Sequence, residues 1–203
     1  MFRLALATAL FFAGSLPALA DPGPEDLRLA CSGAFAKDSD LRRVIAVFGK
    51  ANVKQDKVDG VEGESIDATV VYGDDPAKRL EILWWDEKSH SRPSTIRITE
   101  GPSNWALGAI KAGSPVAVVN KANGKAFKIS GFDWDYGGQV QDWNGGAVPG
   151  LGGEGCSVQV SFSHEGNLPQ KLLGDGVTIT STDKALAAGK VFVQTLGIGW
   201  PEE

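Results

Sequence analysis

The stretch Ile66-Asp-Ala-Thr-Val-Val-Tyr72 is followed by Gly73-Asp-Asp-Pro76 and then by Arg79-Leu-Glu-Ile-Leu-Trp-Trp85. The two outer segments are rich in β-branched and aromatic residues, which favour extended backbone. Glycine, aspartate and proline between them are typical of a turn. The pattern therefore predicts an antiparallel hairpin. Trp84 and Trp85 are consecutive, so their side chains point to opposite faces of the sheet and one of them faces away from the core.

The residues on either side of this hairpin predict a helix and a further strand. Upstream, apolar residues at positions 41, 44, 45 and 48 have helical spacing, with Ser39 as the N-cap and Gly49 as the left-handed residue that ends the helix. Downstream, Ser94 to Thr99 alternates as a third strand. We expect residues 39–100 to form one helix-plus-sheet unit. A lead-in with a short helix over residues 25–32 precedes it, in segment 21–38.

The second half of the chain predicts a similar series of elements. Ser114 is a suitable N-cap and Pro115 a suitable first residue for a helix that stops near Gly124. A hairpin follows, with strands Phe132–Tyr136 and Gln139–Trp143 around a Gly137-Gly138 turn. An alternating strand is expected from Cys156 to Ser163. The last elements are a helix through Ala188, capped by Ser181-Thr182-Asp183, and a strand over 191–196.

Two short strings suggest that the halves are related. Gly49-Lys50-Ala51 and Gly124-Lys125-Ala126 lie 75 positions apart, and a Tyr-Gly pair follows each, at Tyr72 and Tyr136. A tandem repeat explains both matches, and chance similarity of short strings is the alternative. We therefore predict an α+β protein of two related helix-plus-antiparallel-sheet units, residues 39–100 and 101–203. Short helices pack on one sheet face and the other face is partly open.

The same residues carry a resemblance to known families. Gly113-Ser-Pro-Val-Ala-Val-Val-Asn120 followed by Gly124-Lys-Ala-Phe127 resembles the opening of SmpA/OmlA-type outer-membrane assembly lipoproteins. It also resembles one repeat of tandem β-lactamase-inhibitor proteins. The block Gly131-Phe-Asp-Trp-Asp-Tyr-Gly-Gly138 is similar to one found in a family of exported bacterial proteins. These resemblances imply a binding or assembly scaffold. Ala126 stands where the lipoprotein modules carry proline.

The N-terminus predicts export. Arg3 precedes an apolar run from Leu4 to Ala13, and Ala18-Leu-Ala20 supplies the small residues of a cleavage site, so residues 1–20 have the pattern of a signal peptide. The run is shorter than the roughly 20 residues that span a bilayer. Lipidation at Cys31 is disfavoured, because Arg28 stands where an apolar residue is needed. We expect a periplasmic or secreted bacterial protein with no membrane anchor after cleavage.

The composition of the remaining chain narrows its partners. Without Arg3 it has 19 basic and 25 acidic residues, a net charge of −6, and no basic run, which excludes nucleic acid as the expected partner. Cys31 and Cys156 form an even pair, and in an oxidising compartment they are expected to form a structural disulfide. Two free thiols are the alternative.

No catalytic constellation is evident. His90 and His164 are the only histidines, both lie among polar residues, and both are expected to be solvated loop residues. We expect no metal site and no cofactor. Ser181-Thr-Asp-Lys184 matches a Ser-x-x-Lys string, but a helix cap explains the serine better. The chain is therefore expected to be non-catalytic, with the question of enzymatic activity left open.

Five residues are candidates for binding. Asp133 and Asp135 would share one face of a predicted strand and suit glycosidase-like or metal-binding chemistry, while solvation of an acidic strand face is the simpler interpretation. Trp85 and Trp143, the latter followed by Asn144 in a turn, are either exposed platforms or core residues. The leading hypothesis is a binding, inhibitor-like or assembly module whose open sheet face contacts a protein. The alternatives are an envelope glycan hydrolase using Asp133 and Asp135, and a carbohydrate-binding module.

Overall fold

The computed structural model describes residues 27–99 and 101–202, so the expected signal peptide and residues 21–26 lie outside the described residues. Within them are strands β1 (Val53–Asp59), β2 (Ser65–Val71), β3 (Leu80–Asp86), β4 (Ser91–Ile98), β5 (Lys128–Ser130), β6 (Val140–Asp142), β7 (Ser157–His164), β8 (Thr178–Thr180) and β9 (Val191–Gly199). The helices are α1 (Leu41–Phe48), α2 (Val116–Asn123) and α3 (Lys184–Ala188). Short 3₁₀ turns are η2 (Gly33–Phe35), η3 (Lys50–Asn52), η4 (Val61–Gly63), η5 (Val148–Gly152) and η6 (Gln170–Leu172).

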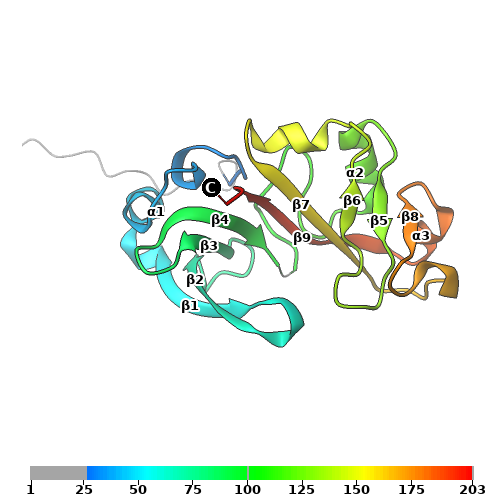
Figure 1. The fold of residues 1–203 in the computed structure, drawn as a ribbon, viewed down its shortest axis with the longest axis horizontal. Coiled ribbons are helices and arrows are strands. Elements are labelled where there is room, and N and C mark those ends of the chain that lie inside the picture. Colours follow the sequence, from blue (N-terminus) through cyan, green and yellow to red (C-terminus); the bar gives the residue numbers. More distant parts are fainter. Residues whose placement is uncertain (1–26, 100, 203) are drawn as a thin grey trace, which may run out of the picture.

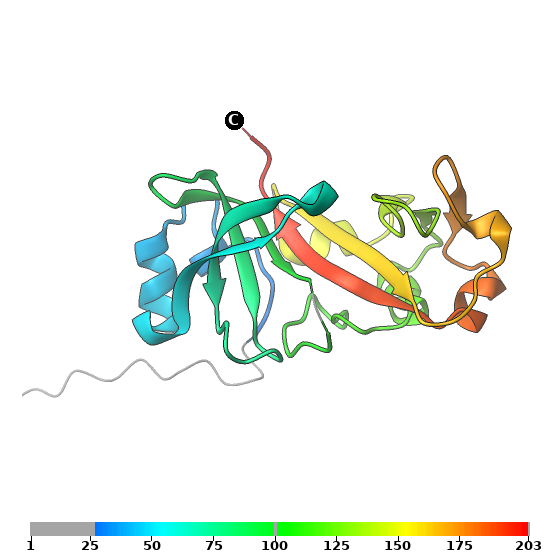
Figure 2. The ribbon, with the colours of Figure 1, turned by 90° about the horizontal axis from the view of Figure 1, so that it is seen from below.

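The strands form two antiparallel sheets, which confirms the α+β class. The larger sheet has the order β1-β2-β3-β4-β9-β7 and the smaller one the order β6-β5-β8. In Figure 1, α1 and β1 to β4 form one end of the molecule, whereas α2, α3 and the smaller sheet form the other. Strands β7 and β9 run side by side between the two ends (Figure 2). These two long strands therefore connect the two ends of the molecule.

The predicted hairpin is present. Strands β2 and β3 pair with Val71 opposite Leu80, and β4 continues the sheet from β3. Trp84 is buried and Trp85 is 38% exposed, as expected for consecutive residues of one strand. Strand β1 was not expected, because its sequence Val-Lys-Gln-Asp-Lys-Val-Asp is mostly charged. It is an edge strand, where charged residues prevent unwanted pairing with other chains.

The helix caps differ in detail from the sequence prediction. Asp40, not Ser39, is the N-cap of α1, and its carboxylate accepts from the Arg43 N–H at 2.9 Å. Ser39 is buried instead and donates to the Ala34 carbonyl. Gly49 ends α1 with positive φ but extended ψ rather than a left-handed conformation. Pro115 is itself the cap of α2, one residue later than predicted, because Ser114 accepts a hydrogen bond from the Lys111 N–H.

Two predicted elements are wrong. Phe132–Tyr136 is not a strand, and Asp133 within it has φ 61°. The strand that pairs with β6 is β5, which ends two residues before Phe132. Segment 131–138 is a loop whose Gly138 approaches the Phe162 carbonyl too closely for any side chain. The described part of the predicted 25–32 helix, residues 27–32, is not helical. Leu27 and Leu29 are both buried, an alternation that fits extended backbone, and this segment bonds to Ala106 instead.

One core cluster joins the helices to the larger sheet. The buried apolar residues of the helices are Val44, Phe48, Val116, Val119 and Leu186, and they belong to the same cluster as the sheet residues Ile82, Ile96, Leu196 and Ile198. The described helices therefore pack on one face of this sheet. Cys31 and Cys156 form the predicted disulfide, which ties the chain just before η2 to the start of β7.

The predicted boundary between two repeat units does not coincide with a boundary between sheets. Strands β7 and β9 belong to the predicted second unit, yet they extend the sheet of the first. Strand β9 lies between β4 and β7 and pairs with both. The tandem repeat stays a prediction.

Candidate functional site

The second face of the six-stranded sheet, here called the open face, follows from the strand register. Residues opposite one another in antiparallel strands point to the same side. Glu81 lies opposite Arg97, Arg97 opposite Gly197, and Gly197 opposite Gln159. In the next row, Leu83 lies opposite Thr95, Thr95 opposite Gly199, and Gly199 opposite Ser157. The residues between these positions, such as Ile82, Ile96 and Ile198, point to the opposite side and belong to the core. The two rows therefore face away from the helices.

Two glycines of β9 lie in the middle of the open face. A Cβ atom at Gly197 would lie 2.8 Å from the Ile96 carbonyl, and one at Gly199 would lie 2.7 Å from the Ser94 carbonyl. Both distances are too short for a real side chain, so the close approach of β4 requires glycine at both positions. Strand β9 therefore contributes no side chain to the open face at these two positions, and both glycines are buried among the residues around them, which include Arg97 and Gln159.

A buried carboxylate organises the charges next to these two glycines. Glu81 is 4% exposed, and it accepts from Arg79 Nη2 at 3.1 Å and from Arg97 Nε at 3.0 Å. Arg97 Nη2 also donates to the Asp59 carbonyl. A buried carboxylate requires such partners. Because one Glu81 serves two arginines, the cluster keeps one net positive charge and donors that point toward solvent.

This cluster lines a hollow of about 940 Å³, here called the polar hollow and defined by Arg79, Glu81, Arg97, Asp135, Gln139 and Gln194. Asp135 is thus one predicted site residue that reaches the open face, from the loop between β5 and β6. Asp133, two residues earlier, does not line this hollow. The structure therefore gives the two carboxylates different surroundings.

Asp133 is engaged by a histidine. His164 Nε2 lies 2.9 Å from Asp133 Oδ1, and His164 Nδ1 lies 2.7 Å from the Gly166 carbonyl. The hydrogen bond to Asp133 raises the pKa of His164, with a smaller contribution from Gly166. His164 is the last residue of β7, not a solvated loop residue. No local pattern predicted its pairing with Asp133, because 31 positions separate the two residues.

Trp85 lines a second hollow of the open face, of about 670 Å³, here called the tryptophan hollow. It is defined by Ile66, Leu83, Trp85, Thr95, Gln159 and Trp200. Trp85 Nε1 donates to the Trp200 carbonyl at 3.0 Å, and Trp200 Nε1 donates to the Phe35 carbonyl at 2.9 Å. These bonds fix the orientation of both indoles and do not occupy the ring faces.

Trp143 and Asn144 lie away from the open face, near the smaller sheet. The ring centroid of Trp143 is 5.1 Å from that of Phe127, and Trp143 packs half-buried against the core. Asn144 donates to the Ala126 carbonyl at 2.7 Å and so holds the turn after β6. The structure thus separates these two residues from Trp85.

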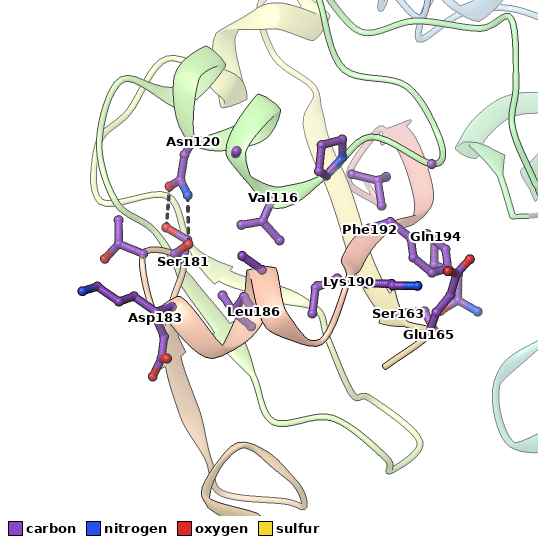
Figure 3. A pocket seen from close by; sticks show the side chains of 18 of the residues that line it. Val116, Asn120, Ser163, Glu165, Ser181, Asp183, Leu186, Lys190, Phe192 and Gln194 are labelled. Atoms are coloured by element: carbon purple, nitrogen blue, oxygen red, sulfur yellow. Dashed lines mark hydrogen bonds between the residues drawn. The ribbon is translucent and has the colours of Figure 1, made fainter. Parts of the chain in front are cut away.

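A third recess, the α2–α3 groove, was not predicted from the sequence. It has a volume of about 1040 Å³ and lies between α2, α3 and the start of β9. Figure 3 shows Val116 and Leu186 on its two walls, the hydrogen-bonded Asn120–Ser181 pair at one end, and Lys190, Glu165 and Gln194 at the other. Gly113, Pro115, Val116, Ala117 and Asn120 all line it, so the 113–120 string noted in the sequence forms one wall.

Metal and membrane signatures were sought in the part of the chain that the structure describes. Those residues contain no cluster of three or more histidine, cysteine, aspartate or glutamate side chains that could hold a metal ion. No described helix is long and apolar enough to cross a membrane.

Comparison with known proteins gave no significant match to a family model, to a curated protein sequence or to a solved structure.

Proposed function

We propose that this chain is an exported, non-catalytic binding module of the bacterial cell envelope, and that the open face is its surface for a protein partner. The observation that carries this proposal is the side-chain-free strip at Gly197 and Gly199, which lies between the polar and tryptophan hollows. Because both glycines are buried by their neighbours, a partner would contact the side chains that border the strip, among them Arg97 and Gln159.

The residue types around the strip support a protein partner. Tryptophan and arginine are the residues most enriched among those that dominate protein–protein binding energy. Trp85, Trp200, Arg79 and Arg97 all line the two hollows of this face. The tethered indoles and the paired arginines are held in place before binding, which reduces the entropy lost on association.

Photo-crosslinking tests this surface in cells of the native host. A photoreactive amino acid is placed at Thr95 or at Gln159 on the open face, and at exposed Lys128 on β5 as the control. We expect the same discrete protein adduct from the first two positions and none from Lys128. The identified partner should then bind purified Thr95→Arg at least about tenfold more weakly than wild type. Adducts that are equal at all three positions, or absent from the open face, would contradict the proposal.

An envelope glycan is the second candidate ligand, and the tryptophan hollow favours it. Trp85 has its N–H bonded and remains 38% exposed, with Gln159 and Thr95 beside it as hydrogen-bonding groups. An exposed indole next to polar side chains provides apolar and polar contacts together. Binding on a glycan array that quenches tryptophan fluorescence and disappears in Trp85→Ala would support this candidate. No array binding and unchanged fluorescence would count against it.

A further inference from the structure

The α2–α3 groove borders the surface used by the proposed function, and its floor is apolar. Val191 and Val193 form the floor between the walls at Val116 and Leu186, and Leu186, Val191 and Val193 are each at most 4% exposed. The rim includes Ala117 and Ala187, which are exposed. A recess of this size with an apolar floor and polar side chains around it is typical of a small-molecule site.

At one end of the groove, Asn120 and Ser181 bond to each other, and the next residues of the chain, Thr182, Asp183 and Lys184, also line the groove. Asn120 Nδ2 donates to the Ser181 carbonyl at 2.9 Å, and Ser181 Oγ donates to Asn120 Oδ1 at 2.6 Å. Ser181 Oγ also accepts from the Phe127 N–H. Asn120 and Ser181 satisfy one another, and Asp183 is bonded to Lys171 Nζ and to the Ala185 N–H. The apolar floor that leads to this end is therefore free for the apolar part of a ligand.

The other end carries two charges. Lys190 and Glu165 both line it, and among the described residues neither forms an ion pair. Lys190 also has φ 50°, a conformation that is uncommon for residues other than glycine. Thr99 and Gln194 line both this groove and the polar hollow, so the arginine pair lies next to the same end. An anionic group together with a cationic group would complement this arrangement.

We propose that the α2–α3 groove binds a monoacyl phospholipid with a zwitterionic head group. The acyl chain lies along Val116, Leu186 and Val193 toward the Asn120–Ser181 end. The phosphate pairs with Lys190 and the head-group ammonium with Glu165. This assignment accounts for both the apolar floor and the two unpaired charges at one end.

The test is calorimetric titration of the delipidated, oxidised protein with lauroyl lysophosphatidylethanolamine below its critical micelle concentration. Ala187→Trp fills the rim of the groove, and Ala188→Trp, at an exposed neighbour that does not line it, is the matched control. Lys190→Asn removes the charge with a residue that tolerates positive φ. Circular dichroism and the unfolding midpoint establish that each variant is folded.

We expect saturable binding to wild type and to Ala188→Trp. Affinity should fall at least about tenfold in Ala187→Trp and about three- to tenfold in Lys190→Asn. Laurate and neutral decyl maltoside should bind more weakly than the zwitterionic lipid. No binding to wild type, or equal binding to the Ala187→Trp and Ala188→Trp variants, would overturn the site. Laurate binding as tight as that of the lysophospholipid would overturn the head-group assignment.

Discussion

The two faces of the six-stranded sheet are built from alternate residues of the same strands, yet they have opposite characters. One face presents Ile82, Ile96 and Ile198 to the helices and is fully buried. The other carries the buried Glu81, the partly exposed Arg97 and two buried glycines, and the polar and tryptophan hollows lie on it. Strict alternation along each strand makes this possible, because neighbouring side chains point in opposite directions. The comparison separates residues that hold the fold together from residues that are free to serve binding.

Loss of the disulfide should have the largest effect on the covered face. The bridge closes a separation of 125 residues and holds the segment that contributes Leu27, Leu29 and Phe35 to the core. Cys31→Ser combined with Cys156→Ser should lower the free energy of unfolding by about 4 kcal/mol. Urea unfolding of oxidised wild type and the double variant measures this. Equal unfolding midpoints would show that the covered face does not depend on the bridge.

A matched pair of substitutions compares the faces directly. Ile82→Ala leaves a cavity in the covered face and should cost about 3 kcal/mol. Thr95→Ala, one strand away on the open face, should change stability by less than about 0.5 kcal/mol. The same urea titration reports both values. A loss for Thr95→Ala as large as that for Ile82→Ala would refute the division into a structural and a free face.

Glu81 is a buried charged residue of the open face. Glu81→Ala would leave Arg79 and Arg97, which are 29% and 18% exposed, without their carboxylate. We expect a loss of about 2 kcal/mol, less than for a fully buried pair because both arginines retain contact with solvent. Asp74→Ala, which breaks the exposed Lys54–Asp74 pair, is the control and should cost under about 0.5 kcal/mol. Similar losses in both variants would contradict the structural role of Glu81.

The smallest effect concerns His164, where β7 meets the 131–138 loop. Its pKa is raised in the folded protein, chiefly by Asp133, so its stabilising contribution is fully present below the unfolded pKa of about 6.5 and is lost as pH rises through the folded value. The contribution should stay under about 1 kcal/mol, since Asp133 is 55% exposed. Unfolding free energies from pH 5.5 to about 8.5 should decline less steeply in His164→Gln. If the unfolding free energy of His164→Gln had the same pH dependence as that of wild type, the His164–Asp133 pair could not be the source of that dependence.

Local patterns in the sequence predicted most of the larger sheet and the disulfide. β-Branched runs and turn residues located β2 and β3, and alternation located β7. Strand β1 was missed because its pairing with β2, not its own composition, holds a charged segment in the sheet. The Asp133–Asp135 segment was misjudged because aromatic alternation suggested a strand where close backbone contacts impose a loop.

The candidate surfaces were less predictable. Trp85 was identified as one of two candidate platforms, but its tether to Trp200 joins residues 115 positions apart. The α2–α3 groove combines residues from Thr99 to Gln194, and no local pattern marks such an assembly. The 113–120 string was noticed as a motif, yet only the packing of α3 opposite it makes a recess.

The central position of β9 also affects how the chain reaches its native state. Every other described strand precedes β9 in sequence, and β7 joins the larger sheet only through it. Until β9 is available, strands β1 to β4 have an unpaired edge at β4 and β7 lacks its neighbour. Such long-range pairing slows folding and leaves strand edges exposed to aggregation in the meantime. A nascent chain of this protein therefore cannot complete the larger sheet until β9 has been synthesised.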